Sequence, residues 1–188
     1  KTTEGYSRQQ ILDVLDIKDV PTLELKCKEL WNKYYSNDGQ TTMVLANSLW
    51  LTNRQSYNQN TIDSLADNFY ASVYSGDFTD KKYTQALRDW INEQTGGLLK
   101  ESVDNVEFTH ETVFSLMSTV YFKAPWQRKF SSLNNTTGVF HSPSGDRQVE
   151  FMNLKEDYDI VYYSDNYMAT RLGLGDNFWM DIILPDQN

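Results

Sequence analysis

The chain has 188 residues, of which 39% are hydrophobic, 14% aromatic and 23% charged, a composition typical of a globular domain rather than a disordered segment. Its formal net charge is −9 and no basic stripe appears along it, so we do not expect a nucleic-acid partner. No apolar run approaches the roughly 20 residues that a membrane span needs, so we do not expect a membrane partner either.

Three lysines cluster near the start of the chain, at Lys26, Lys28 and Lys33, with acidic residues between and around them. This mixed pattern predicts a solvated helix face, and binding of a sulfated polysaccharide there is the less favoured alternative. The single cysteine, Cys27, excludes an internal disulfide but does not indicate a compartment.

Helices are predicted over most of the first half of the chain. Ser7 and Gln10 form a capping-box pattern ahead of apolar residues at helical spacing, and a second helix is expected to open at Pro21. The turn residues at 36–39 end this second helix, and the apolar run over residues 41–50 favours a buried strand.

Two more helices are predicted after that strand. In the first, Asn60 is the expected cap, with Asp63 at the third position, and the apolar period of 3.6 continues as far as Val73. The second is expected over about residues 81–94, and it ends before Gly96 and Gly97, where a left-handed backbone has a low energetic cost.

Strands are predicted over the second half. The stretch from Thr112 to Lys123 is rich in β-branched and aromatic residues, and Ser118 is the one polar residue on an otherwise apolar face. A buried hydroxyl without a partner costs about 1–3 kcal/mol, so we expect Ser118 to have one, for which a nearby backbone carbonyl is the simplest candidate. Short strands are expected around Val139–Phe140, Val149–Asn153, Asp159–Tyr163, Met168–Leu174 and Phe178–Leu184. Helices followed by strands, without regular alternation, predict an α+β fold.

The residues needed for enzymatic catalysis are not recognisable. The two histidines, His110 and His141, lie near no G-x-S-x-G turn, and with one cysteine they form no recognisable metal site. We therefore expect no catalytic residues, no metal and no cofactor. A weak alternative, a hydrolase, would require His141 in a pocket with a serine and a carboxylate. Two overlapping sequons begin at Asn134 and Asn135 and would be glycan acceptors in a eukaryotic secretory pathway.

The stretch VFSLMSTVYFKAPWQRKF, residues 113–130, resembles the serpin signature usually written LVLVNAIYFKGxWxxxF. Phe122, Trp126 and Phe130 fall on the register of that signature, whereas Ser118 and Thr119 depart from its usual Asn and Ala. Serpins are a family of serine-protease inhibitors.

Further stretches resemble the same family in the same order. Residues 45–51, LANSLWL, are similar through Asn47 to the strand before helix E. Residues 87–99 resemble the helix F signature INxWVxxxTxGKI through Trp90, Thr95 and Gly97, and residues 178–186 resemble a strand that ends in a Leu-Pro-Asp turn.

The resemblance implies a partial serpin fold, with a large mixed or antiparallel sheet, flanking helices and a second, strand-rich half. Residues 1–188 are then a single incomplete domain without an internal boundary, from about helix D to the strand before helix G. The resemblance assigns Ser118 to the "shutter" and Trp126 to the "breach", two regions where the main sheet opens. Asn47, Trp90, Thr95, Gly97, Phe122 and Phe130 are structural positions of the family's motifs.

The function implied is inhibition of a serine protease, or alternatively a cysteine protease, by cleavage of a reactive loop and its insertion as a strand into the main sheet. The loop itself would lie beyond Asn188. The alternative within the family is a non-inhibitory binding, carrier or chaperone module. The first ten residues show neither the basic start nor the apolar run of a secretory leader, so localisation stays open, although the resemblance favours an extracellular protein.

Overall fold

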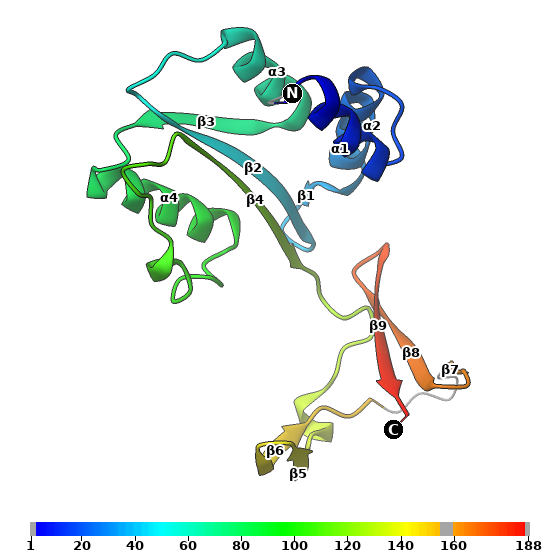
Figure 1. Ribbon diagram of the computed structural model, residues 1–188. Helices are drawn as coiled ribbons and strands as arrows, with labels where there is room; N and C mark the ends of the chain where they lie inside the picture. Colours follow the sequence, from blue (N-terminus) through cyan, green and yellow to red (C-terminus); the bar gives the residue numbers. More distant parts are fainter. Residues whose placement is uncertain (1–2, 155–159, 187–188) are drawn as a thin grey trace. The chain divides into compact units, whose positions relative to one another are not determined.

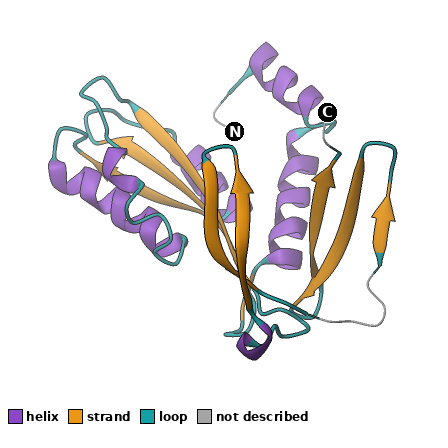
Figure 2. Cartoon of the chain, turned by 90° about the horizontal axis from the view of Figure 1, so that it is seen from below, coloured by secondary structure: helices purple, strands orange, loops and turns teal. Residues whose placement is uncertain are grey.

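The structure, a computed structural model, describes residues 3–154 and 160–186. It divides into two compact units, Lys1–Lys123 and Ala124–Asn188, and each is described by itself. Helices and mainly antiparallel strands occur together without regular alternation, which confirms the predicted α+β class (Figure 2). The predicted single incomplete domain stays a prediction about the whole protein.

The described residues of the first unit contain four α-helices. These are α1 (Gly5–Val14), α2 (Val20–Tyr34), α3 (Gln59–Phe69) and α4 (Lys81–Gln94), and a short 3₁₀ helix, η1 (Val103–Asn105), follows α4. No helix among the described residues is long and apolar enough to cross a membrane.

Two of the predicted helix starts are wrong. Helix α1 begins at Gly5, ahead of the expected capping box at Ser7, and its N-cap, Glu4, makes no side-chain bond to the helix. Helix α3 is capped by Asn58, not Asn60, because the Asn58 side chain is the one that accepts a bond from the free backbone N–H of Thr61. The starts of α2 and α4 agree with the prediction, and the carboxylates of Asp19 and Asp80 cap them.

The predicted end of the third helix is also wrong. Helix α3 stops at Phe69 because Tyr70 adopts a left-handed conformation with φ of 52°, and residues Ala71–Gly76 then form strand β3. Val73 fitted the helical period by chance: it lies in a strand, where it and its neighbour Tyr74 are both residues that favour β-structure. The sequence reasoning missed this strand as a separate element.

The sheet of the first unit is built on one long strand. It contains β1 (Ser36–Asn37), β2 (Thr42–Thr52), β3 (Ala71–Gly76) and β4 (Phe114–Lys123). Strand β2 pairs on one edge with β1, antiparallel, and with β3, parallel, and on its other edge with β4, antiparallel. Figure 1 shows β2 between β3 and β4, with α3 and α4 on different sides of the strands.

The core of the first unit lies between this sheet and α4. Trp50 of β2 and Leu87 of α4 are both 0% exposed, and Trp90 and Ile91 of α4 pack in the same cluster. Burying an aliphatic or aromatic side chain of this size stabilises the fold by about 1.5–3 kcal/mol each, so this cluster fixes α4 on the sheet. Met117 of β4 packs against it from the far strand.

The predicted apolar face of β4 is not buried by the described residues. Leu116 is 55% exposed and Val120 is 65% exposed, whereas Met117 and Tyr121, on the opposite face, are half-buried. The reason is that α4 covers only the face of the odd-numbered residues. The alternation was interpreted correctly as a strand, but the assignment of its buried side was wrong for the described part of the chain.

The described part of the second unit consists of strands and a short 3₁₀ helix, η2 (Ser132–Asn134). Its strands are β5 (Thr136–Ser142), β6 (Gly145–Phe151), β7 (Val161–Tyr163), β8 (Tyr167–Leu174) and β9 (Phe178–Pro185). Strands β5 and β6 form one hairpin, and β7, β8 and β9 form an antiparallel sheet. The predicted strands are confirmed in this unit, apart from Asp159, which lies outside the described residues.

Candidate functional site

Strand β4 is the central element of the candidate site, because one of its edges is fixed and the other is not. It pairs with β2 in ten consecutive residue pairs, from Thr42 opposite Lys123 to Leu51 opposite Phe114. Within residues 3–154 and 160–186, β4 pairs with no other strand. An unpaired edge presents a row of backbone N–H and C=O groups that can bond a further strand.

Asn47 and Ser118 lie directly opposite each other in this pairing. The Ser118 hydroxyl donates to Oδ1 of Asn47 at 2.9 Å, and Nδ2 of Asn47 donates to the backbone carbonyl of Phe69 at 2.9 Å. Phe69 is the last residue of α3, so one amide links β4, β2 and the end of a helix. The expected partner of Ser118 therefore exists, although it is a side chain rather than a backbone carbonyl.

Ser118 itself is exposed, which corrects the expectation that its hydroxyl is buried. Asn47 is half-buried, because it lies on β2 beneath the end of α3. The structure thus brings together Ser118 and Asn47, two of the residues that the sequence analysis named separately. Ser48, the other polar residue of the apolar run, is buried and accepts a bond from the indole Nε1 of Trp50 at 2.8 Å.

Three predicted positions lie on or just after α4. Trp90 is buried in the core cluster, and Thr95 is buried with its hydroxyl donating to the carbonyl of Ile91 at 2.7 Å. Gly97 has φ of +80°, a conformation that favours glycine, and its N–H bonds the carbonyl of Asn92 at 2.8 Å. These residues end the helix and hold it on the sheet.

Gly96 makes a close contact with Tyr121 that the sequence did not predict. A Cβ at this position would lie 2.7 Å from the ring of Tyr121 on β4, so glycine allows the end of α4 to approach β4 closely. The prediction used Gly96 only as a helix terminator, because a close approach to a distant strand leaves no local signal in the sequence.

Tyr83, at the start of α4, ties the helix to β2. Its hydroxyl accepts from the N–H of Leu51 at 3.2 Å and donates to the carbonyl of Leu51 at 3.1 Å. Burial raises the pKa of the Tyr83 hydroxyl, so the hydroxyl keeps the proton that it donates. A Cβ on Gly76 would lie 2.6 Å from the Tyr83 ring, so glycine is required beneath it.

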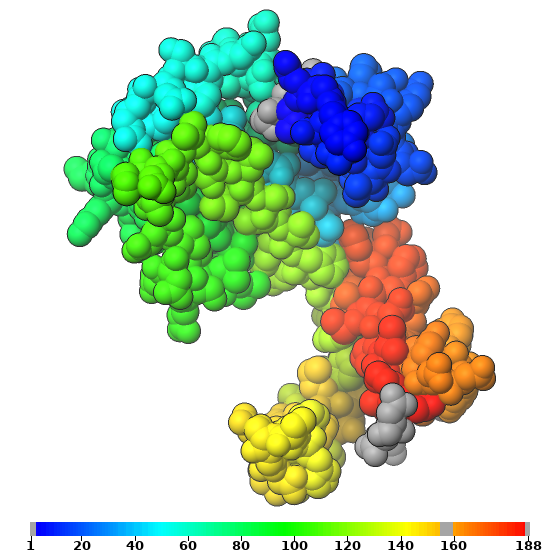
Figure 3. All heavy atoms as spheres, viewed as in Figure 1, coloured from blue at the N-terminus to red at the C-terminus, as the bar shows by residue number. Residues whose placement is uncertain are grey.

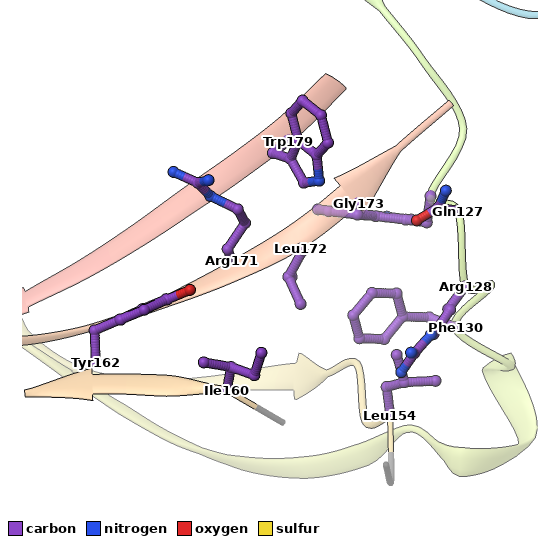
Figure 4. Close-up of a pocket in the computed structure, with 11 residues that line it drawn as sticks. Gln127, Arg128, Phe130, Leu154, Ile160, Tyr162, Arg171, Leu172, Gly173 and Trp179 are labelled. Carbon is purple, nitrogen blue, oxygen red and sulfur yellow. The ribbon is translucent and has the colours of Figure 1, made fainter. Parts of the chain in front are cut away.

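Trp126 and Phe130 lie in the second unit, where their rings meet edge to face with centroids 5.3 Å apart. Residues 125–127 lie antiparallel to the end of β8, since the N–H of Gln127 bonds the carbonyl of Gly173 at 2.9 Å and that of Gly175 bonds Pro125 at 2.8 Å. Gly173 has no Cβ, and the side chain of Gln127 occupies the space where one would stand (Figure 4).

A cavity of about 260 Å³ adjoins these residues. Figure 4 shows Phe130, Leu172 and Leu154 at one part of it, with Arg171 and Trp179 on neighbouring strands. The guanidinium of Arg171 binds the carboxylate of Asp181 through Nε at 2.5 Å and Nη2 at 2.9 Å, which holds the pKa of Asp181 below its ordinary value.

The remaining predicted positions contribute little chemistry. Phe122 lies on the exposed face of β4, at 38% exposure. His141 contacts the carboxylate of Asp146 through Nδ1 at 2.8 Å on the β5–β6 hairpin, where both side chains are exposed. Ser142 and Ser144 lie close by but bond each other and Gly145, not the histidine. The side chains of His141 and Asp146 are 78% and 66% exposed, so this pair does not lie in the enclosed pocket that the hydrolase alternative requires.

Comparison with known proteins gives one consistent result. The family model described as serpin (serine protease inhibitor) matches residues 1–188. An uncharacterized serpin-like protein of Methanosarcina acetivorans is 24% identical over 99% of this chain and 45% of its own length. Human neuroserpin is 26% identical over 73% of this chain and 34% of its own length. The structure of Arabidopsis AtSerpin1 in its native stressed conformation superimposes with a TM-score of 0.85 at 24% identity, and covers 99% of this chain and 50% of that one.

Proposed function

Because the chain belongs to the serpin family, whose model matches residues 1–188, we propose that it forms part of an inhibitor of serine proteases. This inhibitor would act by inserting its cleaved reactive loop as a strand beside β4. The chain spans about half the length of the relatives that it matches. The activity proposed is therefore that of the whole protein, and the reactive loop is expected outside this chain. Loop insertion as a strand is itself an established example of strand addition in serpins.

The observation that carries the proposal is the asymmetry of β4. On the β2 side it is fixed by ten residue pairs and by the link from Ser118 through Asn47 to Phe69. On the other side, no strand among the described residues pairs with it. A strand that slides in can therefore use β4 as a template without disturbing its attachment to β2.

The energy available from such an insertion is large. A strand of ten residues along β4 forms about ten backbone hydrogen bonds, and at about 0.5–1.5 kcal/mol net each this amounts to roughly 10 kcal/mol. That quantity is comparable with the whole stability of an ordinary domain, which is about 5–15 kcal/mol. It is enough to distort a protease that remains covalently attached to the loop.

The proposed sheet-opening residues have distinct parts in this account. Ser118 and Asn47 would keep β4 attached to β2 while the far edge opens. Trp126 and Phe130 would hold the segment after β4 against β8. The backbone bonds between residues 125–127 and the end of β8 support this anchoring role. The contact of Gly96 with Tyr121 would keep α4 close to β4 until the sheet rearranges.

The test is to incubate the whole protein with serine proteases, and with a cysteine protease for comparison, and to analyse the products by denaturing electrophoresis. Inhibition predicts a complex that survives SDS and contains both proteins. Cleavage of the protein without a stable complex, with every protease that cuts the loop, would contradict inhibition. That result would instead support the alternative of a non-inhibitory binding, carrier or chaperone module.

A further inference from the structure

The turn that leads into β5 carries two overlapping sequons that have different surroundings. Asn134, with Thr136 as its hydroxyl residue, is the last residue of η2, and Asn135, with Thr137, follows it. All three residues of η2 are exposed, and Leu133 within it is 93% exposed. Figure 3 shows the adjoining β5–β6 hairpin, coloured yellow, at the surface on the face drawn.

The backbone of Asn134 is held while its side chain is left open. Its N–H donates to the carbonyl of Ser131 at 2.9 Å, and its carbonyl accepts from Nδ2 of Asn153 at 3.0 Å. The same Nδ2 also donates to the Thr136 hydroxyl at 3.0 Å. The Asn134 side chain is exposed and makes no hydrogen bond among the described residues, so a group attached to its Nδ2 breaks none there.

The side chain of Asn135 is engaged instead. Its Nδ2 donates to Oε1 of Glu150 on β6, and since an ionised carboxylate can only accept, the nitrogen must be the atom that faces Glu150. Its Oδ1 is buried and has no hydrogen-bond partner among the residues that the structure describes. A bulky group on Nδ2 would need the space that Glu150 occupies. Turning the amide outward would instead take the donor away from that carboxylate.

We propose that Asn134 is a site of N-linked glycosylation and that Asn135, despite its own sequon, is not. In the reaction Nδ2 of Asn134 attacks the anomeric carbon of an oligosaccharide carried on a lipid diphosphate. The new N–C bond forms as the C–O bond to the diphosphate breaks, the lipid diphosphate leaves with the bonding electrons, and the amide loses one proton. The folded turn accommodates the product at Asn134, because the side chain already lies in solvent.

The proposal does not depend on protease inhibition, and two matched variants test it. Asn134→Gln removes only the first sequon, and Thr137→Ala removes only the second while leaving both asparagines in place. The whole protein and each variant are secreted from cultured eukaryotic cells behind a secretory leader. They are then treated with an amidase that converts each glycosylated Asn to Asp, and the peptides are sequenced by mass spectrometry.

The expected result is conversion at Asn134 in the wild type and in Thr137→Ala, and loss of the glycan in Asn134→Gln. Thermal unfolding of each variant made without glycans shows whether it folds, so a loss of glycan is not confused with a loss of structure. Conversion at Asn135 in the wild type, a glycan retained by Asn134→Gln, or an unmodified wild type would overturn the proposal.

Discussion

Removing the hydroxyl of Ser118 and removing that of its neighbour Thr119, both on β4, should change the free energy of unfolding in opposite directions. Ser118 has a partner in Asn47, whereas the hydroxyl of Thr119 is buried and has no hydrogen-bond partner among the described residues. Ser118→Ala deletes one hydrogen bond, worth about 0.5–1.5 kcal/mol net, and we expect the lower half of this range because Ser118 is exposed. Thr119→Val replaces the unpaired hydroxyl by a methyl group, and since such a group costs about 1–3 kcal/mol when buried, the variant should be more stable by about 1 kcal/mol.

The measurement is urea unfolding of the whole protein, followed by circular dichroism, for both variants and for Asn47→Ala with and without Ser118→Ala. Asn47→Ala should be the most destabilising single change, because it also leaves the Phe69 carbonyl without its donor. The coupling between Asn47 and Ser118 should be about 0.5–1 kcal/mol, as for residues in one hydrogen-bond network. If Ser118→Ala and Thr119→Val shift the free energy of unfolding in the same direction, the difference drawn between the two hydroxyls is wrong. If the effects of Asn47→Ala and Ser118→Ala are additive, the proposed link between Asn47 and Ser118 is wrong.

Further predictions concern the attachment of α4 and the turn before β2. Gly76→Ala places a methyl group 2.6 Å from the Tyr83 ring and should lower the free energy of unfolding by about 1–3 kcal/mol; an unchanged urea midpoint would contradict this contact. Tyr83→Phe removes both bonds to Leu51 and should cost about 1–3 kcal/mol by the same measurement, whereas a loss below 0.5 kcal/mol, roughly the lower limit for one bond, would contradict it. The backbone N–H of Thr41 is the main cause of the lowered pKa of Asp38, so its stabilising contribution is full above its ordinary pKa of 3.8 and is lost as the pH falls through the lower folded value. Asp38→Asn should therefore destabilise the protein at neutral pH and progressively less in acid; a difference that is constant with pH would refute it.

The sequence predicted most elements because their signals are local. The strand at β4 and the helix at α4 were found from periodicity, and the chain's family was recognised from motifs that lie in the same order as in serpins. The buried side of β4 was assigned wrongly, since alternation shows that one face is apolar but not whether the described residues cover it. Strand β3 was missed because the left-handed position that separates it from α3 is occupied by Tyr70, and not by a glycine that would have marked the break in the sequence.

The site was predicted only in part, for a related reason. Ser118 stood out as a polar residue on an apolar strand, but its partner Asn47 lies 71 residues away and is brought opposite it by strand register. The approach of Gly96 to Tyr121 and the position of Tyr83 above Gly76 also depend on packing between distant segments. Such contacts are properties of the folded sheet, and no spacing along the chain indicates them.

The most direct test of strand insertion beside β4 is to compare the thermal unfolding of the whole protein before and after its reactive loop is cut by a protease. An inserted strand worth roughly 10 kcal/mol, at about 1–2 °C per kcal/mol for a domain twice the length of this chain, should raise the unfolding midpoint by about 10–20 °C. An unchanged or lower midpoint after complete cleavage would contradict the proposed role of β4.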